Sequence, residues 1–282
     1  MKKLNNKYKG WDSEEHLDEF NIWNTYSNYE FKFKWGSFLE NKILNQVLKS
    51  KNDIKVIEVG CATGTTVRWL KLNGTFNNKN YTGIDLSGPT IKKAKKMYPS
   101  AIFKKVDLNY LNNLTFKYDY VFSRDTLMHQ EKPLDFLDSL LSVSEKGLIL
   151  RTRTKDNGKT EFDFEKSCQM HYNKYWMPYI VMNINEILDF LSSFKFIEKV
   201  IINRSYEILG GHNYRFLPKD LYLKNAGGAE TTIHIKIDRS KNHKKFKTIY
   251  TNIKEGHSLI NEKEFKKYFF AIIRRLKIIL NF

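Results

Sequence analysis

The chain has 282 residues and a formal net charge of +17, from 48 Lys and Arg against 31 Asp and Glu. This length allows one elaborated domain or two small ones, and it is enough to bury a large core. The positive charge suits an anionic partner such as a nucleic acid, an acidic membrane surface or a phosphorylated substrate, although an AT-rich coding sequence, which favours Lys, Asn and Ile, explains it equally well.

Cysteine usage and hydropathy argue against several classes of protein. The two cysteines, Cys61 and Cys168, belong to no CxxC pair or Cys/His cluster, so we expect no metal site and no disulfide framework. No run of about 18 apolar residues predicts a membrane span. The charged start of the chain lacks the apolar stretch of a signal peptide, and we therefore expect a cytoplasmic protein.

The chain begins with a polar segment that is rich in aromatic residues. We expect residues 1–35 to form an extension, which either closes over a bound ligand as a lid or docks on the core as a surface arm. Apolar residues at helical spacing then predict a helix over residues 36–50.

Segments typical of strands and helices alternate from residue 54 onward. This alternation predicts an α/β fold, with a parallel sheet covered by helices on both faces. The expected strands are residues 54–59, 81–85, 101–107, 118–123 and 147–154, and the expected helices start near residue 65 and cover residues 88–98 and 133–144.

The later part of the chain has a different pattern. Residues 155–183 are rich in aromatic side chains and are expected to be irregular. A long loop over residues 206–230 is expected to be functional or disordered, as such loops usually are. A helix over 183–194 and strands over 196–205 and 231–237 complete a domain that we place at residues 36–238.

Residues 239–282 form a basic tail. An amphipathic helix is predicted within it, because Phe265, Phe269, Ile272, Leu276 and Ile279 share one face of a helical wheel and basic residues lie opposite. Such a helix contacts a membrane surface, binds a partner or docks on its own domain. A peripheral membrane contact through residues 262–282, at the inner face of the membrane, is one of these three outcomes.

A glycine-containing turn follows the first strand, in the stretch VIEVGCATGTTVRWL at residues 56–70. Gly60 and Gly64 let the backbone approach a ligand closely, and the following helix presents free N–H groups at its N-terminus. The turn has neither the Lys-Ser/Thr of a Walker sequence nor the third glycine of the full dinucleotide-binding fingerprint.

Acidic residues end the next two strands. Asp85 and Asp107 come to the same edge of a parallel sheet as the glycine turn, where carboxylates can accept hydrogen bonds from a ribose and from an adenine amino group. Each of them can instead simply cap a helix. Their succession after the glycine turn favours a nucleoside site.

These motifs resemble the class I S-adenosylmethionine (SAM) dependent methyltransferases over roughly residues 40–154. The matching stretches are EVGCATG (58–64), GIDLS (83–87), VDL (106–108) and YDYVFSRDTLMH (118–129), with Ala62 in place of the usual middle glycine. The resemblance implies a Rossmann-like sheet of seven strands, the last of them antiparallel, with SAM as the cofactor. The implied cofactor-binding residues are Glu58, Gly60, Cys61, Ala62, Gly64, Asp85, Leu86, Asp107, Leu108 and Ser123.

The same resemblance places the acceptor pocket at the loops that follow strands four, five and six. His129 is the best-placed candidate for a general base, because its ordinary pKa suits that role. Asp125 is a second candidate, and Arg124 is expected to pair with an anionic substrate. The expected substrate-binding residues are Tyr175, Trp176, His212, Tyr214 and Arg215.

The acceptor itself follows only from a loose resemblance. The stretch from RTRT through YWMPYIVMNINEIL is similar to methyltransferases of bacterial surface-polysaccharide biosynthesis, which implies that the acceptor is a sugar hydroxyl or a glycan phosphate, either free or on a lipid carrier. Charge keeps an RNA methyltransferase as an alternative, weakened by the absence of a Pro-Cys pair or an Asn/Asp-Pro-Pro-Tyr motif. A binding module without catalysis is the other alternative.

Overall fold

The computed structural model of the chain describes residues 8–14, 17, 23–50, 53–107, 109–164, 167–172, 175–212 and 214–252. Leu108 and residues 253–282 lie outside these ranges. The expected adenine contact of Leu108 and the expected amphipathic helix therefore stay predictions.

Helices and strands alternate through the first half of the chain, and strands dominate the second half. The helices are α2 (Asn28–Ser37), α3 (Leu39–Ser50), α4 (Thr65–Leu72), α5 (Gly88–Met97), α6 (Pro133–Ser142) and α7 (Ile184–Ser192). The strands are β1 (Val56–Val59), β2 (Tyr81–Asp85), β3 (Ile102–Lys105), β4 (Tyr118–Arg124), β5 (Ser144–Lys155), β6 (Gln169–Tyr172), β7 (Tyr175–Pro178), β8 (Met182–Asn183), β9 (Ile197–Tyr206), β10 (Arg215–Phe216), β11 (Ala229–Ile237) and β12 (Lys247–Asn252). Short 3-10 helices are η2 (Leu111–Asn113), η3 (Leu127–His129), η4 (Lys219–Tyr222) and η5 (Lys224–Ala226).

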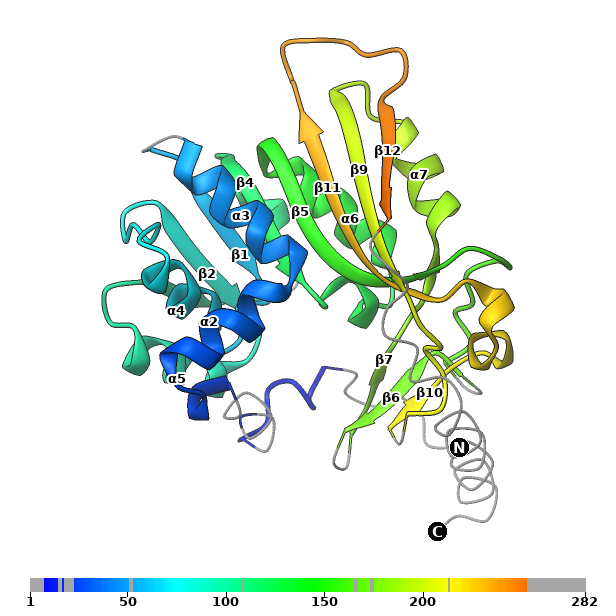
Figure 1. Ribbon diagram of the computed structural model, residues 1–282, viewed down its shortest axis with the longest axis horizontal. Coiled ribbons are helices and arrows are strands. Elements are labelled where there is room, and N and C mark those ends of the chain that lie inside the picture. Colours follow the sequence, from blue (N-terminus) through cyan, green and yellow to red (C-terminus); the bar gives the residue numbers. More distant parts are fainter. Residues whose placement is uncertain are drawn as a thin grey trace.

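A nine-stranded sheet runs through the molecule in the order β12-β9-β11-β5-β4-β1-β2-β3, with β8 paired to β5 (Figure 1). Its neighbouring strands are parallel, except that β11 runs antiparallel to β5 and β9. The expected Rossmann-like α/β fold is confirmed, and all seven expected strands are present. The strands β8 and β12 are additional, and β12 continues the sheet beyond residue 238.

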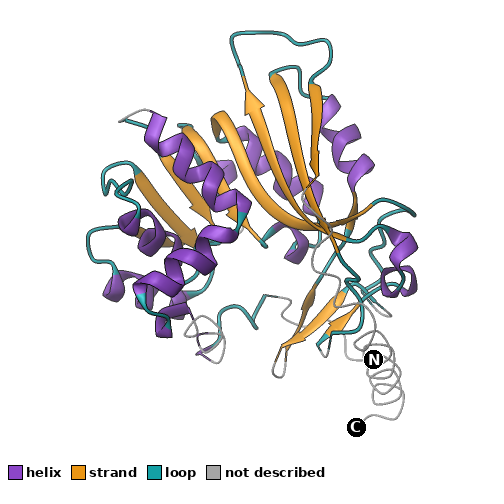
Figure 2. Ribbon diagram, in the orientation of Figure 1, coloured by secondary structure: helices purple, strands orange, loops and turns teal. Residues whose placement is uncertain are grey.

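The sheet separates two apolar cores. Because successive residues of a strand point to opposite faces, neighbouring side chains of one strand enter different cores. Ile57 of β1 packs with α6 and α7 on one face, whereas Val56 packs with α2, α3, α4 and α5 on the other. Val121 and Phe122 of β4 divide in the same way. Helices therefore cover both faces of the sheet (Figure 2).

A second sheet has three strands in the order β10-β6-β7 and lies near the carboxyl ends of the parallel strands (Figure 1). Its strands come from the segment after β5 and from the segment after β9. The expectation of irregular structure over residues 155–183 is therefore wrong at β6 and β7, and the expectation of a loop over residues 206–230 is wrong at β10. Strands of two to four residues are too short to show an alternating pattern in the sequence. The second segment is tied to β5 by an ion pair of 2.8 Å between the buried Lys155 and Asp220.

Buried charges connect α3 to the strands β4 and β5. The Glu40 side chain, which is 1% exposed, pairs with Arg124 at 2.9 Å and with Arg151 at 3.2 Å. Its second oxygen accepts a hydrogen bond of 3.2 Å from Thr232 Oγ1 of β11. One carboxylate of α3 thus bridges three neighbouring strands, and two buried guanidinium groups share its negative charge.

The substitution Glu40→Gln tests this bridge. We expect the free energy of unfolding to fall by about 3 kcal/mol, because the variant keeps the shape of the side chain but leaves two buried arginines short of a counter-charge. Chemical denaturation of the wild type and the variant measures the difference.

Glu145→Gln is the matched control. The Glu145 side chain is 44% exposed and pairs loosely with Lys117 at 3.8 Å and Arg239 at 3.7 Å. Removal of such an exposed pair is expected to cost less than about 1 kcal/mol. Equal losses in the two variants would show that the Glu40 bridge is no more stabilising than a surface pair.

Candidate active site

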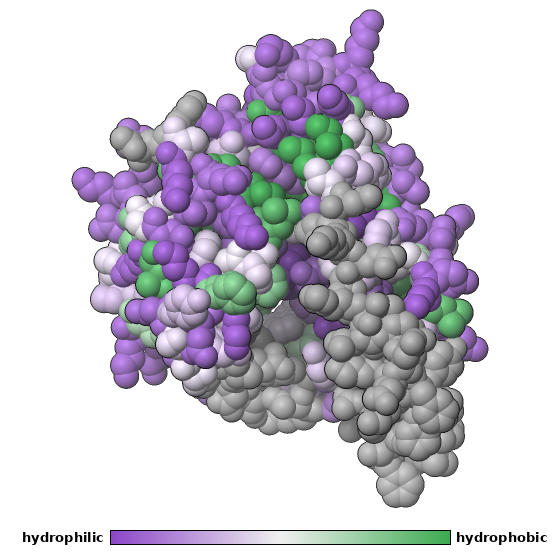
Figure 3. Space-filling view, in the orientation of Figure 1, coloured by the Kyte–Doolittle hydropathy of each residue, from purple (hydrophilic) through white to green (hydrophobic). Residues whose placement is uncertain are grey.

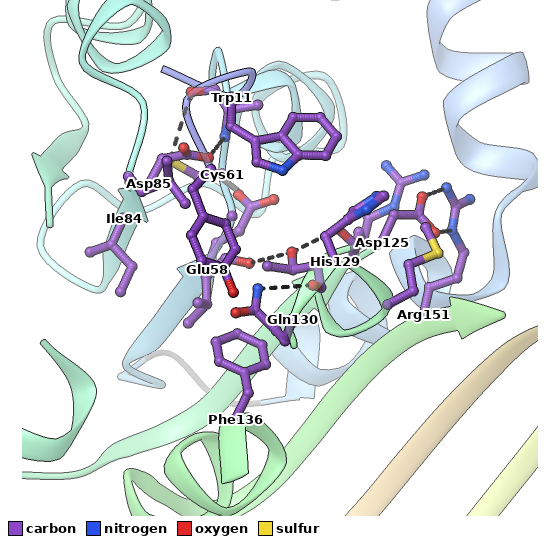
Figure 4. Close-up of a pocket in the computed structure, with 18 of the residues that line it drawn as sticks. Trp11, Glu58, Cys61, Ile84, Asp85, Asp125, His129, Gln130, Phe136 and Arg151 are labelled. Atoms are coloured by element: carbon purple, nitrogen blue, oxygen red, sulfur yellow. Dashed lines mark hydrogen bonds and ion pairs between the residues drawn. The ribbon is translucent and has the colours of Figure 1, made fainter. Parts of the chain in front are cut away.

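A cavity of about 360 Å³ opens at the carboxyl ends of β1, β2 and β4. Its lining includes the glycine turn and residues from β5, from the 3-10 helix η3 and from the second sheet. Figure 3 shows a largely hydrophilic face that is hollowed near its middle. Figure 4 shows Trp11 beside His129, with Glu58 and Asp85 on one side and Asp125 and Arg151 on the other.

The glycine turn after β1 adopts left-handed backbone geometry three times. The φ angles are 80° at Gly60, 46° at Ala62 and 77° at Gly64. A Cβ atom on Gly60 would collide with the side chain of Thr126, so a larger residue would displace the segment that carries η3. Gly64 caps α4 without a side-chain hydrogen bond, and Thr65 and Thr66 of the first helical turn line the cavity. A helix N-terminus of this kind favours a carboxylate or another acceptor group.

Asp85 is fixed at the end of β2 by backbone donors. Its Oδ2 accepts a hydrogen bond of 2.9 Å from the Ala62 N–H, and its Oδ1 accepts one of 2.9 Å from the Ser87 N–H. Each carboxylate oxygen retains a second lone pair. Burial raises the pKa of Asp85, although these N–H donors partly offset that effect. The carboxylate is therefore preorganised to accept hydrogen bonds from hydroxyl groups of a ligand.

Glu58 lies beneath the glycine turn. Its carboxylate accepts hydrogen bonds from Thr66 Oγ1 at 2.7 Å and from the Tyr81 hydroxyl. Burial raises the pKa of Glu58 to about 7, even though both donors favour the charged form. Glu58 lines the cavity, but its known contacts connect β1 to α4 and β2.

The N-terminal segment crosses the cavity. Asp12 accepts a hydrogen bond of 2.6 Å from the Gly88 N–H and pairs with Lys105 at 3.0 Å, which anchors the segment beside Asp85. The ring of Trp11 lies 4.6 Å from that of His129, and Tyr8 also lines the cavity. This placement agrees with both expected roles of the extension, as a cover for the ligand and as an arm docked on the core.

Asp125 sits in a strained position between arginines. Its φ angle is 52°, in the left-handed region that side chains rarely adopt. Its carboxylate pairs with Arg151 and, at 2.7 Å, with Arg153. Burial opposes ionisation, but Arg151 and Arg153 outweigh it and hold the pKa of Asp125 well below its usual range. A carboxylate with so low a pKa is a weak base, so the second role considered for Asp125 has little support from this geometry.

Arg124 is also held within the protein. It pairs with Glu40, and its guanidinium lies 4.1 Å from the Trp35 ring centroid. Burial, together with the neighbouring charge of Arg151, lowers the pKa of Arg124 to about 10. Although Arg124 lines the cavity, its charge is already compensated, and the expected pairing with an anionic substrate is not favoured.

His129 keeps one nitrogen available for chemistry. Its Nδ1 lies 2.9 Å from the carbonyl oxygen of Pro178, which can only accept, so Nδ1 carries the proton and Nε2 is the acceptor nitrogen of the neutral ring. Burial lowers the pKa of His129 to about 4. The imidazole is therefore neutral at pH 7, with a defined tautomer. It is also a weaker base than an ordinary histidine, so the expectation that its ordinary pKa suits the base role is wrong, and the free Nε2 is what supports that role.

The structure gathers most of the expected residues around this cavity. Those that line it are Glu58, Gly60, Cys61, Ala62, Asp85, Leu86, Asp107, Arg124, Asp125, His129, Tyr214 and Arg215. The expected residues Gly64, Ser123, Tyr175, Trp176 and His212 are not among the lining residues. Ser123 donates a hydrogen bond of 3.0 Å to the Val59 carbonyl, and Trp176 packs against His171 and Phe216 in the second sheet.

Several lining residues are additional to the expected ones. Arg151 and Arg153 belong to the RTRT end of β5 and line the cavity. Glu230, which is not a lining residue, stands directly opposite Arg153 on β11. The alternation of Arg and Thr in an otherwise apolar strand is the sequence signal that indicates these residues, because a charged side chain in a buried strand is costly unless an opposite charge pairs with it. Trp11 belongs to the aromatic extension that was expected as a lid or a surface arm, whereas the contacts of Glu40, which supports Arg151 from α3, depend on long-range packing and have no local signal.

Two kinds of feature are absent from the described residues. No three His, Cys, Asp or Glu side chains gather there as a metal-binding group. None of the helices in the described ranges is long and apolar enough to cross a membrane.

Comparisons with known proteins agree with this geometry. Residues 50–204, more than half of the chain, match the family model described as "Methyltransferase domain". The chain is 32% identical over 104 residues to the chloroplastic magnesium protoporphyrin IX methyltransferase of Arabidopsis thaliana, a match that covers 36% of this chain and 33% of that protein. It is 23% identical over 186 residues to the putative methyltransferase 235L of Invertebrate iridescent virus 6, covering 64% of this chain and 65% of the relative.

A similar solved structure is the magnesium protoporphyrin IX methyltransferase of Synechocystis PCC 6803 with bound SAM. It has 15% sequence identity and a TM-score of 0.48, and the superposition covers 81% of this chain and 94% of that one. The resemblance inferred from EVGCATG, GIDLS and VDL is confirmed by the family match over residues 50–204. The chain belongs to the methyltransferase domain family.

Proposed function

We propose that the protein is an enzyme that transfers the methyl group of SAM to a hydroxyl group of a small polar acceptor. The observation that carries this proposal is that a single cavity contains both a candidate cofactor site and a candidate base. The glycine turn and Asp85 line one part of it, and His129, with Nε2 as its acceptor nitrogen, lines another.

The residues of the first part fit the chemistry of SAM. Asp85 would accept hydrogen bonds from the ribose hydroxyls, and the N-terminus of α4 would face the carboxylate of the amino-acid moiety. Asp107 and Leu86 line the same part and would lie near the adenine. Bound SAM would supply a methyl group activated by a sulfonium, which departs as a neutral thioether.

The chain's own contribution is to position the acceptor and to take its proton. Nε2 of His129 would receive the proton of the acceptor hydroxyl, and the hydrogen bond from Nδ1 to the Pro178 carbonyl would stabilise the resulting imidazolium. Trp11 and Tyr179 hold the His129 ring at centroid distances of 4.6 Å and 5.4 Å. These ring contacts would hold the base in position toward the reacting hydroxyl.

A sugar or glycan is the acceptor class that we propose, as in surface-polysaccharide biosynthesis. Aromatic rings such as Trp11, Tyr179 and Tyr214 lie beside hydrogen-bonding groups in the cavity, a composition that suits a polar ring with an apolar face. RNA is the second candidate, supported by the net charge of +17. A steep loss of acceptor binding with added salt would favour RNA, because salt weakens phosphate contacts.

The substitution Asp85→Ala tests the cofactor site. Calorimetric titration of the wild type with SAM and with its demethylated product is expected to show binding that weakens about 100-fold in the variant, the effect of losing two hydrogen bonds to a charged group. Asp135→Ala, at a side chain that is 75% exposed, is the control and should bind normally. Folded wild-type protein that binds neither ligand would rule out the proposed enzyme.

The substitution His129→Asn tests the base. Asparagine retains a donor for the Pro178 carbonyl but has no basic nitrogen, so methyl transfer to an accepted hydroxyl should fall by about 100-fold or more. In the wild type the pKa of His129 is about 4, so this group should leave kcat/KM flat between about pH 5.5 and 8. The control is His234→Asn, since burial lowers the pKa of His234 to about 4 as well but the residue does not line the cavity.

The two measurements separate a base from a packing residue. A variant that loses activity equally between about pH 5.5 and 8 without binding its acceptor more weakly agrees with the base role, whereas a loss that comes from weaker acceptor binding would indicate a packing residue. Full activity of His129→Asn would contradict that role and would indicate an acceptor that needs no deprotonation.

A further inference from the structure

Arg215 differs from the other arginines of the cavity. Arg124, Arg151 and Arg153 all pair with carboxylates, and the network that they form includes Glu40, Asp125, Glu207 and Glu230. Of the four arginines that line the cavity, Arg215 alone makes no ion pair with a described residue. Its Nε is buried and has no hydrogen-bond partner in the described part of the chain.

The ring of a buried tyrosine lies beside this arginine. Tyr179 is 2% exposed and lines the cavity, yet its hydroxyl has no hydrogen-bond partner among the described residues. The Arg215 guanidinium lies 4.9 Å from the Tyr179 ring centroid. Burial raises the pKa of Tyr179, so the phenol stays protonated and can donate. A buried donor that lacks an acceptor costs free energy, which a ligand oxygen in this position would recover.

The charges around Arg215 and Tyr179 favour a singly charged anion as the ligand. Three network arginines face four carboxylates, so the network has no positive charge to spare for a ligand. One guanidinium and one phenol then match the single charge and the two oxygens of a carboxylate. A phosphate dianion would leave a negative charge uncompensated near the ionised Asp125, which is unfavourable beside the buried Tyr179.

We propose that Arg215 and Tyr179 form a carboxylate-binding subsite, and that the methyl acceptor is a hydroxyl compound that carries a carboxylate, such as a sugar acid. This inference rests on the proposed function, because the subsite shares its cavity with His129. The ring of His129 lies 5.4 Å from the Tyr179 ring, so a carboxylate held here would orient the rest of the acceptor toward the base.

Saturation-transfer NMR of the wild-type protein, saturated with the demethylated cofactor product, provides the test, because it detects weak ligands. The probes are D-glucuronate, neutral D-glucose and D-glucose 6-phosphate. We expect glucuronate to bind at least tenfold more tightly than either of the others. Equal binding of glucose and glucuronate, tighter binding of the phosphate, or no signal from glucuronate would each overturn the subsite.

Three variants assign the effect to the two side chains. Arg215→Met and Tyr179→Phe should each weaken glucuronate binding about tenfold, whereas Arg215→Lys, which keeps the charge but not the two parallel donors, should weaken it less. Tyr29→Phe, at a side chain that is 82% exposed, is the matched control and should bind normally. Unchanged glucuronate binding in both Arg215→Met and Tyr179→Phe would refute the assignment.

Calorimetry with the demethylated cofactor product distinguishes this failure from a failure of the proposed function. Arg215→Met and Tyr179→Phe should bind that product as the wild type does, since neither residue contacts the glycine turn in the described structure. Wild-type protein that binds the product but not glucuronate refutes the subsite alone. Wild-type protein that binds neither cofactor form refutes the methyltransferase.

Discussion

The buried pairing of carboxylates with arginines is the constraint on which both the fold and the cavity depend. Arg151 and Arg153 project from β5 into a part of the core where an unpaired charge would be costly, and four carboxylates compensate them and Arg124. These carboxylates come from α3, from the segment after β4, from the end of β9 and from β11. The network therefore joins elements far apart in the sequence, and Asp125 keeps its strained backbone because two arginines hold its side chain.

The cavity is divided between two parts of the chain with different origins. The parallel strands β1, β2 and β4 supply the glycine turn and Asp85, which follow directly from strand ends. The second sheet combines segments that follow β5 and β9. Arg215 of β10 lines the cavity together with Tyr179, which follows β7 and whose ring lies 5.4 Å from that of His129 in η3. One part of the cavity therefore depends on the parallel strands, and the other depends on the long segments that follow β5 and β9.

The sequence predicts the first part far better than the second. Strand length, alternation and the glycine turn are local signals, so the parallel strands and the positions of Gly60 and Asp85 at their carboxyl ends follow from them, whereas the place of His129 comes from the family resemblance. Tyr175, Trp176 and His212 were expected in the cavity because of their type and their loops, but residue type does not determine which side of a short strand faces the ligand. Partners such as Glu40 and Thr232 are 192 residues apart and meet only through tertiary packing.

The path of residues 8–14 has a consequence for the order of events in turnover. This segment holds Gly88 and Lys105 through Asp12, beside the glycine turn, and it covers His129 through Trp11. A single strap therefore closes over both parts of the cavity. If the strap has to lift during the proposed methyl transfer, both products would gain an exit at once, so their departures would be kinetically linked and a slow opening would set the pace of the whole cycle.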